Sequence, residues 1–198
     1  MGADFFGRYD IRFDIIKCDA AHLDELLVLA KQTFIEAFEK VSDPENFKLY
    51  VANNFTPSVL AEELAHSETS FYLMRTRENE NVGYIKLRWD RGKEFFPHHR
   101  SIELQRIYVL EKFWYQGYGK ELLRFAEDHA SRADYHWIYL VVWCENADAI
   151  KFYERNYWKQ FATKDFQFGN EIHHDVVMKK NIGFTSIFGY DWIKHIAT

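Results

Sequence analysis

A carboxylate stands beside a break in the pattern of one strand-like segment, where it could accept a proton. Residues 102–109 alternate between apolar and polar side chains, but the alternation slips by one residue in the middle. The apolar residues are Ile102, Leu104, Ile107 and Val109. A β-bulge would absorb the slip, and bulges are common beside active sites because they leave N–H groups unpaired and splay the strand. A local twist would explain the slip equally well.

Glu103 lies next to this break and is our candidate general base. It is a carboxylate inside a segment that otherwise favours a strand. An exposed strand position, or an ion pair with Arg106, would account for Glu103 equally well.

Two glycines, Gly117 and Gly119, follow this strand and lead into a predicted helix. Glycine lets backbone N–H groups approach a ligand closely, and the first turn of a helix can bind a pyrophosphate through its free N–H groups and its dipole. The segment lacks the three-glycine dinucleotide fingerprint and the Lys-Ser/Thr pair of a P-loop. A tight strand-to-helix turn is an equally good reading of the two glycines alone.

A third segment begins at Asn146, which can cap a helix that reaches Tyr153 after two turns. A tyrosine so placed could act as a general acid, because its hydroxyl titrates at about 10. By themselves, Asn146 could be a cap and Tyr153 a half-buried packing residue.

The elements that position these segments follow from hydrophobic periodicity and helix-capping signals. Asp43-Pro44 and Thr56-Pro57 each place a capping side chain before a proline, which the first turn of a helix tolerates. The predicted order is strand 11–18, helix 19–38, helices 44–54 and 57–66, hairpin strands 70–76 and 82–89, loop 91–100, strand 101–109, helix 119–133, strand 137–143, helix 147–155 and hairpin strands 160–168 and 172–179. This order predicts an α/β (α+β) fold with a mixed sheet, in which 101–109 is the fourth strand.

In this combination and order, the three segments resemble the GNAT superfamily of acetyl-coenzyme A-dependent N-acetyltransferases. Its hallmark is a bulged strand, a Gly-rich pyrophosphate loop and a later helix that runs from Asn to Tyr. The resemblance covers about residues 11–180, and within the superfamily the chain looks most like the bacterial spermidine/spermine acetyltransferases of the PaiA type. The segments that carry this closer likeness are Thr33-Phe34 with Phe38, Pro44-Glu45-Asn46, Gly83-Tyr84, and residues 102–109, 142–146 and 149–153.

The resemblance implies a central mixed, mostly antiparallel sheet flanked by helices, with a bulged fourth strand, and acetyl-coenzyme A as co-substrate. Backbone groups of Ile107 and Val109 would hold the acetyl and pantetheine portions, and Asn146 would contact the pantetheine arm. An N–H near Ile107 or Tyr108 would stabilise the oxyanion. The amides that would cradle the pyrophosphate belong to Tyr115, Gln116, Gly117, Tyr118, Gly119 and Lys120.

Two positions depart from the family pattern. Trp114 stands where the family usually has Gln or Arg, so the pyrophosphate loop is expected to rely more on backbone groups. The usual Gly-Phe after the Tyr helix reads Tyr157-Trp158, and we expect Asn156 to take the left-handed turn there.

The implied reaction is direct attack by an amine on a thioester. Alkyl amines titrate at about 10.4, so a proton must leave first, and Glu103 would remove it through a water. Tyr153 would then protonate the departing thiolate.

Composition and net charge narrow the classes of molecule that the protein could bind. A net charge of −5 disfavours a nucleic-acid binder, and no apolar run approaches the roughly 20 residues that span a bilayer. The start of the chain lacks a secretory leader, so we expect a cytoplasmic protein.

Cys18 and Cys144 form no metal-type or redox-type pair, and we expect buried, reduced thiols. We expect no metal, because the adjacent histidines of His98-His99 and His173-His174 would point to opposite faces of a strand.

From the resemblance we expect the acceptor to be a primary amine of a small molecule, a polyamine such as spermidine or spermine. Acidic groups such as Glu36 and Asp43 could attract such a polycation, although a solvated helix face also explains these residues. A protein N-terminus, a lysine or an aminoglycoside is the alternative acceptor, and a non-catalytic acetyl-coenzyme A sensor is the alternative function. We expect one domain over residues 1–180 and an aromatic-rich tail, 181–198, that packs on this domain or on a second subunit in a homodimer.

Overall fold

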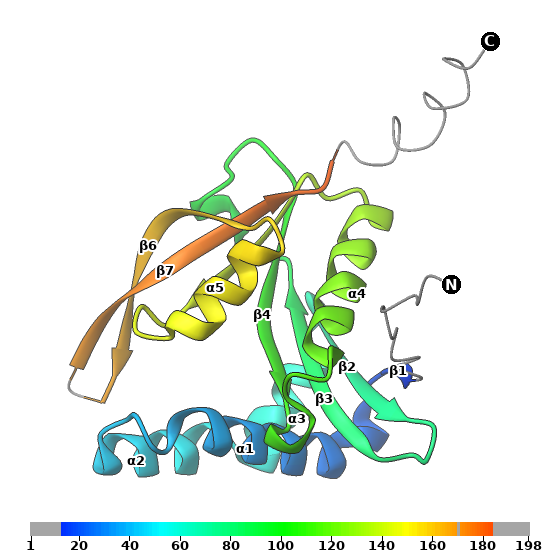
Figure 1. Ribbon diagram of the computed structural model, residues 1–198, viewed down its shortest axis with the longest axis vertical. Helices are drawn as coiled ribbons and strands as arrows, with labels where there is room; N and C mark the ends of the chain where they lie inside the picture. The colour runs from blue at the N-terminus through cyan, green and yellow to red at the C-terminus, as the bar shows by residue number, and fades with distance from the viewer. Residues whose placement is uncertain (1–12, 170, 184–198) are drawn as a thin grey trace, which may run out of the picture.

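One seven-stranded sheet organises the residues that the computed structural model describes, 13–169 and 171–183 (Figure 1). The strand order is β1-β2-β3-β4-β5-β7-β6, and every neighbouring pair is antiparallel except β4 and β5. The strands are β1 (Phe13–Lys17), β2 (Thr69–Thr76), β3 (Asn81–Arg88), β4 (Ser101–Val109), β5 (Trp137–Val142), β6 (Lys159–Phe168) and β7 (Glu171–Asn181). The predicted mixed, mostly antiparallel sheet is confirmed. The expected packing of the tail concerns residues 184–198, which lie outside the described part of the chain.

The helices follow the capping signals of the sequence. They are α1 (Leu23–Phe38), α2 (Pro44–Asn54), α3 (Pro57–Ala65), α4 (Tyr118–Arg132) and α5 (Ala147–Arg155). Asp43 caps α2 by accepting hydrogen bonds from two first-turn N–H groups, and Thr56 accepts one at the start of α3. Asp19 caps a short 3₁₀ turn, Ala20–His22, that precedes α1. No helix in the described ranges is long and apolar enough to cross a bilayer.

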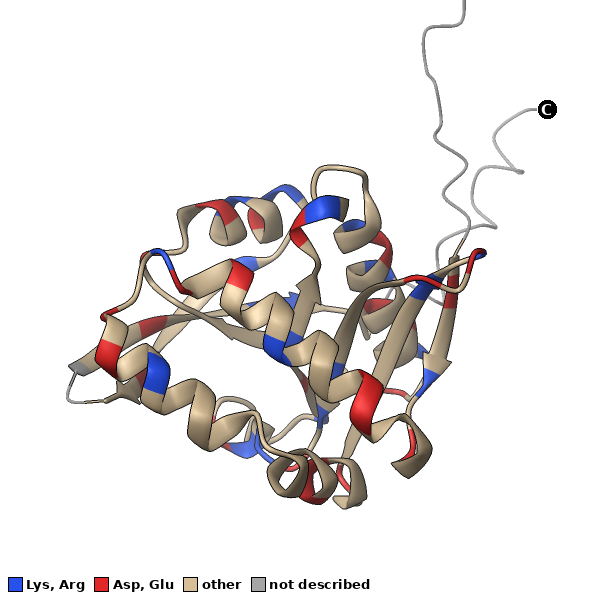
Figure 2. Ribbon diagram, turned by 90° about the horizontal axis from the view of Figure 1, so that it is seen from below, with Lys and Arg blue, Asp and Glu red and all other residues tan. Residues whose placement is uncertain are grey.

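Helices pack on both faces of the sheet (Figure 1). On one face, α4 and α5 contribute Leu122, Leu123 and Tyr153 to a core that includes Ile102 of β4. On the other face, α1 and α3 contribute residues such as Leu26 and Leu60 to a second core. Figure 2 shows acidic and basic segments interspersed along these helices.

The predicted bulge lies in β4 at Gln105. β3 pairs Lys86 with Arg106 but Leu87 with Leu104, so Gln105 has no cross-strand partner on β3. The extra residue lets the apolar side chains on both sides of it reach the α4 core, namely Ile102, Leu104, Ile107 and Val109. It therefore also places Glu103 and Arg106, three residues apart, on the opposite face of the strand.

The strands β4 and β5 part soon after they begin. They pair over three positions, Ser101 to Trp137, Ile102 to Ile138 and Glu103 to Tyr139. Beyond Glu103, β4 continues to Val109 without pairing to β5. The parting leaves a gap inside the sheet at the level of the bulge.

Candidate active site

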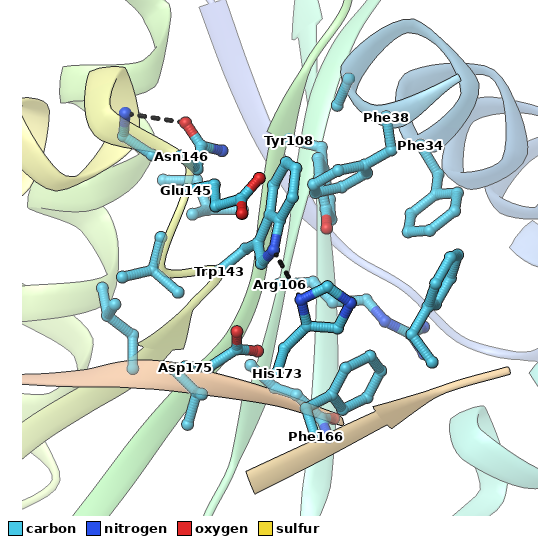
Figure 3. Close-up of a pocket in the computed structure, with 18 of the residues that line it drawn as sticks. Phe34, Phe38, Arg106, Tyr108, Trp143, Glu145, Asn146, Phe166, His173 and Asp175 are labelled. Atoms are coloured by element: carbon cyan, nitrogen blue, oxygen red, sulfur yellow. Dashed lines mark hydrogen bonds between the residues drawn. The ribbon is translucent and has the colours of Figure 1, made fainter. Parts of the chain in front are cut away.

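A cavity of about 900 Å³ opens where β4 and β5 part. Its walls come from β4, the loop between β5 and α5, the β6–β7 hairpin, and helices α1 and α2, and Figure 3 shows side chains from these elements facing one another across it. The wall includes six of the predicted site residues, namely Glu103, Ile107, Tyr108, Val109, Asn146 and Tyr153. The structure thus brings together the candidate base and the candidate acid from distant parts of the sequence.

Glu103 is buried in the cavity wall, 9% exposed, and its Oε2 atom has no hydrogen-bond partner among the described residues. Arg106 does not pair with it, because the two terminal nitrogens of that guanidinium donate to Glu63 of α3 at 2.7 and 2.9 Å. Burial raises the pKa of Glu103 above its ordinary value, and the nearby cations Arg91 and Lys164 oppose the rise. The structure therefore excludes both an exposed Glu103 and an ion pair between Glu103 and Arg106.

Tyr153 lies on α5 and is 7% exposed, with its ring packed against Phe152 and Trp158. It also borders the cavity, so it is at once a packing residue and a member of the site. Burial raises the pKa of its hydroxyl above the ordinary value. The phenol therefore keeps its proton at neutral pH.

The predicted pyrophosphate residues, 115–120, form the turn into α4 and are not part of the cavity wall. Gly117 precedes the helix with a φ of 93°, and its carbonyl accepts from the N–H groups of Lys120 and Glu121. A Cβ atom at Gly119 would meet Phe152 at 3.9 Å, which is ordinary contact. The protein itself therefore leaves room for a side chain at Gly119, beside the free N–H groups of the first turn.

The structure shows what the two residues that depart from the family pattern do. The indole Nε1 of Trp114 donates to the carbonyl oxygen of Val109 at 2.6 Å and so ties the loop to the end of β4. The expectation for Asn156 is wrong: its φ is −99°, and Tyr157 takes the left-handed conformation with a φ of 68°. The reason is that the Asn156 amide donates to the carbonyl of Phe152, which holds Asn156 at the helix end and moves the turn one residue on.

Asn146 caps α5, because its side-chain oxygen accepts from the N–H of Ala149 at 3.0 Å, and it also borders the cavity (Figure 3). Asp43 borders the cavity too, whereas Glu36 lies outside its wall and accepts from the N–H of Glu111 at 2.7 Å.

Both cysteines are free thiols, but the expectation that both are buried is wrong for Cys144. Cys18 is buried, while Cys144 follows β5 in the loop before α5 and is exposed. Among the described residues, no group of three or more His, Cys, Asp or Glu side chains could hold a metal ion.

A charge network under the bulge was not predicted from the sequence. Glu63 of α3 binds Arg106 and also accepts from Lys86 at 2.8 Å, although Lys86 is 1% exposed. Burial and the charge of Arg106 lower the pKa of Lys86 to about 8. An acid on a helix and two bases on different strands carry no shared sequence signal, so only the packing of α3 on the sheet reveals this network.

A closed series of aromatic rings in successive contact surrounds the cavity and was also not predicted from the sequence. Successive ring centroids lie 4.8 to 6.3 Å apart, and the circuit closes on itself. Its members, here called the aromatic collar, are Phe34 and Phe38 of α1, Tyr50 of α2, Trp143 after β5, Phe168 of β6 and His173 of β7. The 18% aromatic content was a signal that such a cluster could form, but its location depends on tertiary contacts.

Comparison with known proteins agrees with this geometry. The model of the Acetyltransferase (GNAT) family matches residues 24–157. An uncharacterized N-acetyltransferase of Lactobacillus delbrueckii subsp. lactis is 27% identical over 166 residues, which cover 84% of this chain and 95% of that protein. An uncharacterized N-acetyltransferase of Mycobacterium tuberculosis is 29% identical over 163 residues, or 80% of this chain and 97% of that protein.

Solved structures share the fold at lower identity. The PaiA N-acetyltransferase from Thermoplasma acidophilum, in complex with coenzyme A, has a TM-score of 0.66 at 19% identity and covers 85% of this chain and 98% of its own. The spermidine/spermine N-acetyltransferase SpeG from Vibrio cholerae has a TM-score of 0.61 at 16% identity, with 86% and 93% covered. Since the family model spans more than half of the sequence, the chain belongs to the GNAT acetyltransferase family and is an acetyl-coenzyme A-dependent N-acetyltransferase.

Proposed function

We propose that the enzyme transfers acetyl from acetyl-coenzyme A to a primary amine of a small molecule, a polyamine such as spermidine or spermine, by direct attack in a ternary complex. The observation that carries the proposal is one cavity bordered by both Glu103 and Tyr153. Glu103 is a buried carboxylate with an unpartnered oxygen, and Tyr153 is a buried phenol. The two groups match the two proton transfers that acetylation of an amine requires.

Glu103 would act as the base. An alkylammonium group titrates at about 10.4, so at neutral pH it must lose a proton before its nitrogen can attack. Glu103 would accept that proton through a water, and its Oε2 has no hydrogen-bond partner among the described residues. The raised pKa of the carboxyl makes its ionised form a stronger base than an ordinary carboxylate.

Tyr153 would act as the acid. As the new C–N bond forms and the C–S bond breaks, the departing thiolate takes a proton, which the phenol of Tyr153 would donate. Burial raises the pKa of this phenol, so it holds its proton at neutral pH but is a weaker acid than a free phenol. A backbone N–H near Ile107 or Tyr108, next to the bulge, would stabilise the oxyanion. Losing one such donor typically costs about 3 kcal/mol of transition-state stabilisation.

Acetyl-coenzyme A would bind along the edge of β4 that faces β5. The gap beyond Glu103 leaves β4 unpaired on its β5 side, so backbone groups of Ile107 and Val109 could hold an extended arm that also reaches Asn146. The amides of Tyr115, Gln116, Gly117, Tyr118 and Gly119 would bind the pyrophosphate, whereas the N–H of Lys120 already donates to the carbonyl of Gly117. The space beside Gly119 and the free first-turn N–H groups of α4 support this placement.

Charge favours a cationic acceptor. Of the Lys and Arg residues that border the cavity, Arg106 is bound to Glu63 and Lys164 to Glu94, whereas Arg91 has no ion-pair partner among the described residues and its charge acts on Glu103. Glu103 and Asp175 border the same cavity without an ion-pair partner in the described ranges. The similar folds of PaiA and of SpeG, the latter a spermidine/spermine N-acetyltransferase, point to the same class of acceptor.

The experiment that tests the proposal is release of free coenzyme A from acetyl-coenzyme A against spermidine, spermine, lysine peptides, N-terminal peptides and aminoglycosides. We expect turnover with spermidine or spermine. Turnover with peptides alone would replace the small-molecule acceptor by a protein. Tight acetyl-coenzyme A binding without turnover of any acceptor would favour a sensor.

A further inference from the structure

The acceptor side of the cavity offers aromatic faces rather than aliphatic walls. The six rings of the aromatic collar come from α1, α2, β6, β7 and the loop after β5, and each of them borders the cavity. Figure 3 shows Phe34 and Phe38 on one side, with Trp143 and His173 facing them. Aromatic faces attract alkylammonium groups through the ring quadrupole and pack well against methylene chains.

His173 is held so that the collar keeps its shape. The indole Nε1 of Trp143 donates to Nδ1 of His173 at 3.2 Å (Figure 3). An indole can only donate, so Nδ1 must be an acceptor, and the proton of the neutral imidazole is on Nε2. This bond joins the β5–α5 loop to β7 and fixes the two rings relative to each other.

Asp175 lies two residues further along β7, on the same face of the strand as His173. It borders the cavity and is 7% exposed. The N–H of Cys144 donates to it at 3.4 Å, and no Lys or Arg of the described residues pairs with it. A carboxylate buried to this degree with one long hydrogen bond lacks the compensation that buried charges normally have.

Glu103 gives a second, independent sign that a cation belongs here. It is more than nine-tenths buried and borders the cavity, its Oε2 has no hydrogen-bond partner among the described residues, and it lies on β4, two strands away from Asp175 in the sheet. One ammonium group can satisfy one of these carboxylates, but a single small amine leaves the other unpaired.

We propose that Asp175 and the aromatic collar form a second-ammonium subsite, which makes the acceptor a diamine or polyamine rather than a monoamine. The reacting nitrogen lies at Glu103, the methylene chain lies along the aromatic faces, and the remote ammonium binds Asp175. This inference rests on the proposed function and adds the determinant of its specificity.

Matched amines of equal chain length provide the test. The kcat/KM of the wild type is measured with putrescine against butylamine and with cadaverine against pentylamine. We expect each diamine to exceed its monoamine by at least tenfold. Asp175→Asn should lower the kcat/KM of the diamines far more than that of the monoamines and so remove most of that ratio.

Two further variants control for folding and for charge. Phe168→Leu keeps an apolar side chain but removes one aromatic face of the collar, and it should reduce the diamine-to-monoamine ratio. Asp134→Asn makes the same charge change at a site outside the cavity wall, in an exposed pair with Arg100, and should leave the ratio unchanged. Melting temperatures establish that each variant is folded.

The outcomes separate the two proposals. Equal kcat/KM for diamines and monoamines in the wild type overturns the subsite but leaves an amine acetyltransferase. Equal losses for both kinds of amine in Asp175→Asn also overturn it. Failure of the wild type to turn over any of these amines, and also spermidine and spermine, overturns the proposed function itself.

Discussion

The network of Lys86, Glu63 and Arg106 makes a quantitative prediction about stability. Glu63→Gln keeps the shape of the side chain but removes the charge that two buried bases share, at 2.7 and 2.9 Å from Arg106 and 2.8 Å from Lys86. Breaking a buried ion pair by removing one partner costs about 3–5 kcal/mol. Since Glu63 and Arg106 are about one-fifth exposed, we expect the lower end, about 3 kcal/mol. That lowers Tm by about 6–12 °C in a chain of this size.

Urea and thermal unfolding, followed by tryptophan fluorescence, measure this loss. Glu80→Gln is the matched control, because Glu80 makes an ion pair with Lys112 in which both side chains are about half exposed. Such a pair contributes about 0–1 kcal/mol. Lys86→Met in the Glu63→Gln background should recover part of the stability, because no unpaired buried ammonium is then left. A Glu63→Gln loss no greater than that of Glu80→Gln would refute the reasoning.

Three further predictions concern catalysis. Glu103→Gln should lower kcat about a hundredfold or more. The wild-type rate should rise with pH as Glu103 ionises, at an apparent pKa above the ordinary carboxyl value. If the rate of Glu103→Gln rises with pH in the same way, the ionisation belongs to another group. Tyr153→Phe should lower kcat while calorimetry finds acetyl-coenzyme A binding nearly intact; unchanged turnover removes Tyr153 from the mechanism. Gly119→Ala should leave stability unchanged or raise it by up to about 1 kcal/mol, since Ala favours helix. It should also raise the KM for acetyl-coenzyme A at least tenfold, and an unchanged KM would place the pyrophosphate elsewhere.

The features that sequence could predict are local ones. The slip at Gln105 follows from the alternation of eight residues, and the openings of α2 and α3 follow from a capping side chain before a proline. The relation between Glu103 and Tyr153 needed the family resemblance, because no periodicity links a strand residue to a helix fifty positions later.

The features that sequence could not predict depend on contacts between distant segments. Asp175 becomes a cavity residue because β7 inserts between β5 and β6, an order that chain sequence does not determine. Glu63 reads as one more polar residue of an exposed helix until α3 is placed over β3 and β4. The left-handed residue after α5 was misplaced by one position because the Asn156 side chain bonds within its own helix.

The parting of β4 and β5 gives the sheet an edge in its interior. Open edges normally template further strands and so favour aggregation, and proteins cover or interrupt them. Here α1 and the β6–β7 hairpin line the same cavity as the edge from Leu104 to Val109 and so flank it (Figure 1). In the binding mode that we propose, the co-substrate is the extended molecule that would meet this edge. We therefore expect the unpaired stretch of β4 to serve as a recognition element, which the co-substrate would complete for the duration of one turnover.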